Sequence, residues 1–285
     1  MSAASVLAYD APSASRARRF LEGTAAVALW MTLGLVLHLS AYGYLLLGIP
    51  ITLAFQRYIR KAPLRAMWVR DAPPFQLRAA GVAIAIGLMI VPLVDLVNLL
   101  RSHASWGHDG WNVAALAGAW AAAYALRYFN RKLLRELLLC LATSGTIGIL
   151  VWILQDVASS GTPQPIGARL WFGVTSLLKF IPVVFLLEEV WFRGVFDSHL
   201  HHPGQKRGVL SAIYVSALWG IWHYPVIPGH QIQTLLPTFA TVIPFHVLIG
   251  VPFSLFWRRS GNLFAPASVH CLIDAVRNGL AGPPV

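Results

Sequence analysis

Nine apolar stretches, separated by short polar segments, constrain the fold of this chain more than any other feature. They cover residues 24–40, 42–55, 80–100, 112–126, 136–154, 170–198, 209–227, 236–257 and 262–280. Most of them approach the ~20 residues that a helix needs to cross a hydrocarbon core of ~30 Å. Backbone amides inside a bilayer must be satisfied internally, so these segments are expected to be helices. The sequence therefore predicts an all-α polytopic membrane helix bundle, with residues 1–285 as a single transmembrane domain.

The first two stretches leave the number of spans open. If residues 24–55 cross the membrane twice, turning around Ala41-Tyr42-Gly43, the bundle has nine transmembrane helices. A single tilted helix over the same residues gives eight. The stretch 42–55 is short for a full span, so a re-entrant or thinned passage would also accommodate it.

Composition places the chain in a lipid bilayer rather than on nucleic acid. Hydrophobic residues make up 57% of the 285 residues and charged residues only 12%, whereas about a quarter of the residues in soluble domains are charged. The net charge of +11 comes from short basic clusters between the apolar stretches. Such clusters are typical of anchors that flank a membrane, and we expect no nucleic-acid partner.

The basic clusters also predict an orientation. With two passes in residues 24–55, they all fall on one side, while segments 102–110, 157–167 and 228–233 on the other side are nearly uncharged. The positive-inside rule then places the N-terminus in the cytoplasm. We expect a multi-pass protein of the bacterial cytoplasmic (inner) membrane, with residues 1–19 as a disordered cytoplasmic tail.

The apolar stretch 170–198 carries two adjacent carboxylates and an arginine, Glu188, Glu189 and Arg193. A charge within a membrane span costs roughly 2.5–3.5 kcal/mol on insertion scales, so such groups indicate a functional site. Arg193 lies one helical turn after Glu189 and can neutralise that carboxylate. Glu188, about 100° further around the helix, would remain free for chemistry.

Two later stretches each contain a histidine, His223 and His270, and Asp274 follows His270 by one turn. Counted from the cytoplasmic ends of their stretches, Glu188, His223 and His270 lie about 15, 21 and 12 Å deep at 1.5 Å per residue. All three therefore reach the middle of the membrane. Carboxylates and histidines at a common depth are the groups that activate water.

Three motifs on these stretches match a known family in order and spacing. They read Glu188-Glu189-x-x-x-Arg193, Trp219-x-x-x-His223 and His270-x-x-x-Asp274. The chain resembles the CPBP family, which comprises CAAX prenyl endopeptidases and bacteriocin-processing (Abi) intramembrane proteases and has the motifs E-E-x-x-x-R, F-x-x-x-H and H-x-x-x-N or H-x-x-x-D. The resemblance covers residues 165–280, the expected catalytic core. Tryptophan replaces the usual phenylalanine at position 219, and aspartate replaces the commoner asparagine at position 274.

The resemblance implies an intramembrane endopeptidase that hydrolyses a membrane-associated peptide or protein precursor. In that family scheme Glu188 activates water, His223 holds the water, and His270 with Asp274 supports the oxyanion. Glu188, His223 and His270 could instead bind zinc with an open position for water. No cofactor is favoured, because a zinc-bound histidine usually has a partner that orients it, and the sequence shows none for His223.

A non-enzymatic membrane protein is the alternative, either a transporter with a buried carboxylate relay or a catalytically silent scaffold. Transporters usually have paired half-repeats, whereas the buried charges here gather in the C-terminal half, which favours the enzyme. Two further histidines, His38 and His246, stand alone in apolar stretches. We interpret both as packing or interhelical hydrogen-bonding residues.

Overall fold

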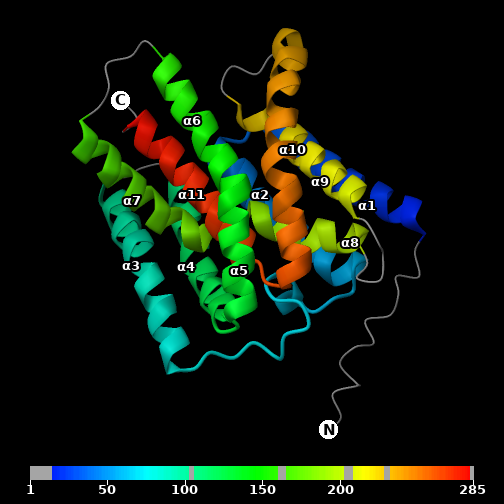
Figure 1. Cartoon of the computed structure of the whole chain (residues 1–285), viewed down its shortest axis with the longest axis horizontal. Coiled ribbons are helices and arrows are strands. Elements are labelled where there is room, and N and C mark those ends of the chain that lie inside the picture. Colours follow the sequence, from blue (N-terminus) through cyan, green and yellow to red (C-terminus); the bar gives the residue numbers. More distant parts are fainter. Residues whose placement is uncertain (1–14, 103–105, 160–164, 202–207, 228–231, 283–285) are drawn as a thin grey trace.

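The computed structural model describes residues 15–102, 106–159, 165–201, 208–227 and 232–282. Within these ranges every regular element is a helix, apart from an isolated bridge between Val69 and Asn262. The α-helices are α1 (Arg16–Val36), α2 (Ala41–Ala54), α3 (Ala79–Ser102), α4 (Trp106–Leu126), α5 (Arg131–Cys140), α6 (Thr146–Ala158), α7 (Ile166–Val183), α8 (Ser198–Leu200), α9 (Val209–Trp222), α10 (Leu235–Ser260) and α11 (Phe264–Ala281) (Figure 1). The predicted all-α fold is confirmed for these residues.

Six helical segments of the described chain are long and apolar enough to cross a membrane. They are Arg16–Val36, Ala79–Arg101, Arg131–Ala158, Ile166–Val183, Val209–Val226 and Leu235–Ser260. By the same measure α2 is too short, and α4 and α11 are long enough but less apolar. The structure thus supports a multi-pass membrane bundle without fixing the predicted number of eight or nine spans.

Helices α1 and α2 form a hairpin that turns at residues 37–40. The ring of Trp30 packs on that of Tyr44, with centroids 5.8 Å apart, and its Nε1 donates to the Tyr44 carbonyl at 2.7 Å. Gly48 permits this approach, because a Cβ there would lie 1.9 Å from the Trp30 ring. The alternative of one tilted helix over residues 24–55 is therefore wrong.

The N-terminal helix begins earlier than the sequence suggests. The Ser15 side chain caps α1 by accepting a hydrogen bond from the Arg18 backbone nitrogen. Residues 16–19 are thus helical, so they do not belong to the predicted disordered tail. Residues 1–14 of that tail lie outside the described residues.

The apolar stretch 170–198 is broken rather than continuous. Helix α7 ends at Val183, directly after Pro182, and the π-helix η5 (Val190–Asp197) begins only after a turn. Proline cannot donate the backbone hydrogen bond to residue i−4, so Pro182 weakens the last turn of α7, where the helix ends. The break covers residues 184–187, and Glu188 and Glu189 begin the helical segment that follows it, so they do not lie in the middle of a long helix.

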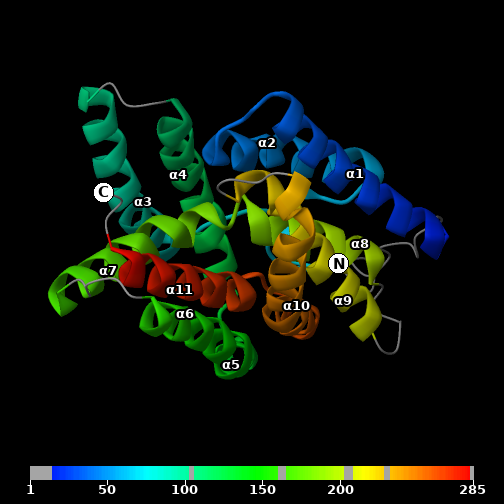
Figure 2. The ribbon, with the colours of Figure 1, turned by 90° about the horizontal axis from the view of Figure 1, so that it is seen from above.

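The segment after α7 occupies the centre of the molecule. Figure 2 shows it surrounded by α2, α4, α9, α10 and α11. All eight residues of η5 are buried. π-Helical geometry is frequent at functional sites, and here it supports the carboxylates that precede it.

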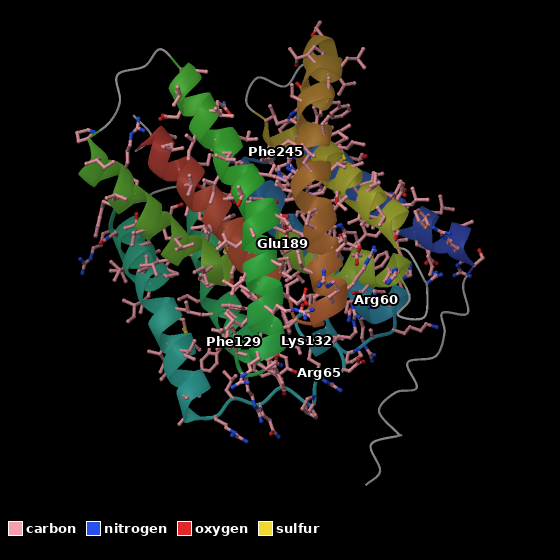
Figure 3. The ribbon with its side chains drawn as sticks, viewed as in Figure 1. Arg60, Arg65, Phe129, Lys132, Glu189 and Phe245 are labelled. Atoms are coloured by element: carbon pink, nitrogen blue, oxygen red, sulfur yellow. The ribbon has the colours of Figure 1, made fainter. Side chains whose placement is uncertain are left out.

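Basic side chains gather at one end of the bundle, the lower end in Figure 3, where Arg60, Arg65 and Lys132 are labelled. Hydrogen bonds connect the segments there, because Arg258 Nη1 donates to the Gly208 carbonyl at 2.6 Å and Arg70 Nη1 donates to the Arg258 carbonyl at 3.3 Å. We call the end formed by Arg60, Arg65, Arg70, Lys132, Arg258 and Arg259 the basic end. The predicted clustering of basic residues on one side is found for these positions, while Lys206 and Arg207 lie outside the described residues.

Candidate active site

A cavity of about 560 Å³ lies between α2, α4, α6, α7, α9, α10, α11 and the segment that follows α7. Its polar and aromatic lining includes Glu188, Trp219, Trp222, His223, His246, His270, Asp274 and Arg277. Four of the six predicted site residues, Glu188, His223, His270 and Asp274, therefore face one space. The other two, Glu189 and Arg193, are fully buried behind it.

Glu188 is the carboxylate that faces the cavity, with 16% of its side chain exposed. Its Oε2 accepts a hydrogen bond from Trp219 Nε1 at 3.1 Å and lies 3.5 Å from His223 Nε2. The tryptophan that replaces phenylalanine in the second motif thus adds a donor that holds the carboxylate. Phenylalanine could not provide this contact.

His223 caps the C-terminal end of α9 and is oriented by the backbone of its own helix. Its Nδ1 lies 2.8 Å from the Trp219 carbonyl, which can only accept, so Nδ1 carries the hydrogen. In the neutral ring, Nε2 then presents a lone pair beside the Glu188 carboxylate. These two acceptors, 3.5 Å apart, can each take one hydrogen of a single water molecule.

Glu189 connects two other candidate residues behind the cavity wall. Its Oε2 lies 3.5 Å from Arg193 Nε, and its Oε1 lies 3.1 Å from His270 Nδ1. Neither contact has the alignment of a hydrogen bond, so the attraction is mainly electrostatic. The sequence predicted the pairing with Arg193 and did not predict the contact with His270.

The Arg193 guanidinium lies between the Glu189 carboxylate and two aromatic rings. Its Cζ is 4.6 Å from the centroid of the Trp219 ring and 5.6 Å from that of Phe253. Cation–π attraction is strengthened where water is excluded. Arg193 therefore supports both Glu189 and the tryptophan that contacts Glu188.

His270 has a carboxylate beside each ring nitrogen. Besides Glu189 at Nδ1, Asp274 Oδ2 lies 3.5 Å from Nε2. Asp274 is held in turn by Arg277, whose Nη1 lies 3.1 Å from Oδ1. This chain of contacts fixes the orientation of the His270 ring on α11.

His246 is part of this cavity, although the sequence analysis treated it as a packing residue. Its ring lies 4.3 Å from that of His223 and 4.5 Å from that of Trp219, and its Nδ1 donates to the Val242 carbonyl at 2.7 Å. One sequence signal could have revealed it. At 1.5 Å per residue His246 lies about 21 Å from the end of α10 at Ser260, the depth expected for His223.

The zinc alternative requires Glu188, His223 and His270 to share one centre. Both His270 nitrogens already face carboxylates, so this set does not fit a shared metal in the observed arrangement. No other group of three His, Cys, Asp or Glu side chains in the described part of the chain forms a candidate metal site. His223 does have an orienting partner, the Trp219 carbonyl, which as a backbone group is not evident from the sequence.

Comparison with known families identifies the segment that carries these residues. Residues 169–276 match the family model of type II CAAX prenyl endopeptidases, Rce1-like. This segment is similar to the Rce1-like family. It agrees closely with the 165–280 core predicted from the motifs, and it includes all six candidate residues. The chain matches no curated protein and no solved structure.

The Rce1-like match and the apolar helices together define the broad class of the protein. The chain is an integral multi-pass membrane protein related to CAAX-type intramembrane endopeptidases. The match lies in the second half of the chain, from α7 to α11. Helices α1 to α6 are outside it, yet α2 and α6 contribute to the cavity wall.

Proposed function

We propose that the chain is an intramembrane endopeptidase in which Glu188 activates water for hydrolysis of a peptide bond. The observation that carries this proposal is the pair of acceptors, Glu188 Oε2 and His223 Nε2, 3.5 Å apart in the wall of the cavity. The expected substrate is a peptide or protein precursor with a segment in or at the bilayer. This activity can be tested with purified protein and a peptide library. Mass spectrometry would identify any new peptide termini.

In the proposed hydrolysis, Glu188 transfers a proton from water to the leaving amine. Water donates one hydrogen to Glu188 and is held through the other by His223, and its oxygen attacks the peptide carbonyl. Glu188 takes up the proton as the tetrahedral intermediate forms and delivers it to the leaving amine. A general base of this kind contributes about 10²–10⁴-fold to the rate.

His270 is the proposed electrostatic partner of the oxyanion. It faces the same cavity as Glu188, and the carboxylates of Glu189 and Asp274 orient its ring. Fixed charges and dipoles beside a developing oxyanion typically supply the largest catalytic term. Glu189 and Arg193, which do not reach the cavity, act as positioning residues.

Asp274→Asn is expected to retain substantial cleavage. An amide of the same shape preserves an acceptor for Arg277 and remains beside His270, so the ring should keep its orientation. Initial rates with a cleaved peptide would be compared with those of Asp274→Ala, which removes both contacts and should be slower. Equal rates for the two variants would argue against an orienting role of Asp274.

His246→Ala is expected to reduce cleavage by about tenfold, which corresponds to about 1.4 kcal/mol of lost transition-state stabilisation. His246 packs on both His223 and Trp219, the two residues that contact Glu188. The measurement is the cleavage rate of purified protein, with His38→Ala as the control, since the cavity lining does not include His38. An unchanged rate in His246→Ala would assign this ring to packing alone.

Topology reporters fused to this chain are expected to place its basic segments and its nearly uncharged segments on opposite sides of the membrane. Fusions after Arg70, Arg135 and Arg259 are expected to report the cytoplasm, because basic loops are retained there. Fusions within residues 103–110 and 159–166 are expected to report the opposite side. A cytoplasmic signal from both of the latter would contradict the proposed orientation.

A further inference from the structure

The cavity is built from the ends of the helices that lie away from the basic end. In α10 the lining residues Thr241 and Phe245 precede the basic pair Arg258 and Arg259, which occupies the last turn. In Figure 3 the label of Phe245 lies on the opposite side of Glu189 from the labels of Arg60, Arg65 and Lys132. The continuous rod of α5 and α6 shows the same order, from Lys132 at its start to the lining residue Gln155 near its end.

Exposure of the lining residues shows where the cavity opens. Trp219, Trp222, His246 and His270 are buried and form its inner part. Ala41, Gln155 and Thr241 are exposed and form its rim, on α2, α6 and α10. The opening therefore lies at the far end of these helices.

A buried layer separates the cavity from the basic end. The residues between the cavity and that end include Glu189, Arg193 and the rest of η5, and all of them are buried. The Gly194 carbonyl, at the back of this layer, already accepts from Arg60 Nη1 at 3.1 Å. The layer closes the cavity on the basic side.

The positive charges outside the basic end are largely neutralised. Arg169 pairs with Asp156 at 2.8 Å, Lys179 with Asp95 at 2.6 Å and Arg277 with Asp274 at 3.1 Å. At the basic end Arg258 and Arg259 are also paired, with Asp197 and Glu136, and Arg101 at the end of α3 lies outside that end, so the asymmetry is one of number: basic residues gather at one end of the bundle. Since basic segments stay in the cytoplasm during insertion, that end is the cytoplasmic one.

We propose that the cavity opens to the extracytoplasmic side of the membrane, so that its substrates are peptide segments reached from that side. Exported precursors and outward-facing segments of membrane proteins have this property, whereas cytoplasmic C-termini do not. The statement about substrates rests on the proposed function. The position of the opening does not, because it follows from the helices and charges alone.

Cysteine labelling tests the position of the opening without measuring catalysis. Thr241→Cys and Gln155→Cys place thiols at the rim, and Lys132→Cys places one at the basic end. The native chain is the control, because Cys140 and Cys271 are both buried and should not react. A membrane-impermeant maleimide is added to intact cells and to inverted vesicles, and labelled protein is detected by a shift in gel mobility.

We expect Thr241→Cys and Gln155→Cys to be labelled in intact cells and Lys132→Cys only in inverted vesicles. Labelling of the rim cysteines from the same side as Lys132→Cys would overturn the proposal, as would protection of both rim cysteines from either side. The pattern should be identical when Glu188→Gln is added. If labelling is as expected but no peptide is cleaved, the proposed function fails while the position of the opening stands.

Discussion

Glu188→Gln is expected to lower peptide cleavage by about 10²–10⁴-fold, the contribution of a general base, while the protein accumulates normally. The amide has the same size and still offers an oxygen to Trp219 Nε1, which now contacts Glu188 at 3.1 Å. The Glu188 side chain faces the cavity and has no buried charge partner. The substitution should therefore have little effect on the stability of the fold. Cleavage rates of purified protein, together with membrane yield and thermal unfolding, separate the two effects.

Glu189→Gln provides the matched control for Glu188→Gln. The two residues are adjacent, but Glu189 is fully buried beside Arg193 and His270. Its neutralisation leaves the guanidinium without a counter-charge, so yield and stability should fall together with activity. Retention of more than about a tenth of the wild-type rate by Glu188→Gln would contradict its role as general base.

Arg193→Ala is expected to destabilise the protein by about 3–5 kcal/mol, the usual cost of leaving one member of a buried ion pair uncompensated. The exposed fraction of both Arg193 and Glu189 is 0%. The substitution also removes the cation from the faces of Trp219 and Phe253. Membrane yield and the unfolding midpoint in mild detergent should both decrease.

A control with the same sequence spacing is available in α1. Arg18 and Glu22 also form an i, i+4 pair, at 2.8 Å, but 69% of the Arg18 side chain is exposed. Arg18→Ala should therefore cost only about 0.3–0.5 kcal/mol, as for exposed helix pairs. Similar losses in Arg18→Ala and Arg193→Ala would show that burial of Arg193 contributes nothing.

The candidate site could be proposed from the sequence because its signals are local. Glu189 and Arg193, like His270 and Asp274, are one helical turn apart, and charge in an apolar stretch is itself informative. These spacings hold in the structure, with contacts of 3.5 Å in each pair. The 165–280 core was also recognisable, since its three motifs occur in order.

Other features could not be predicted from the sequence, because they depend on contacts between distant segments or on backbone groups. His246 is indistinguishable from a packing histidine until α10 is placed against α9, where its ring meets His223. The carbonyl that orients His223 has no side-chain signature at all. The break after Pro182 was hidden because the stretch remains apolar on both sides of it.

Cleavage in water enriched in ¹⁸O tests most directly whether Glu188 activates water to hydrolyse a peptide bond. Purified wild-type protein in lipid nanodiscs is incubated with a peptide that yields new termini, and the products are analysed by mass spectrometry. We predict one ¹⁸O atom in each new C-terminal carboxylate after a single turnover, with no such product from Glu188→Gln. Absence of new termini with the wild-type protein, or the same labelled product at an undiminished rate from Glu188→Gln, would contradict the account.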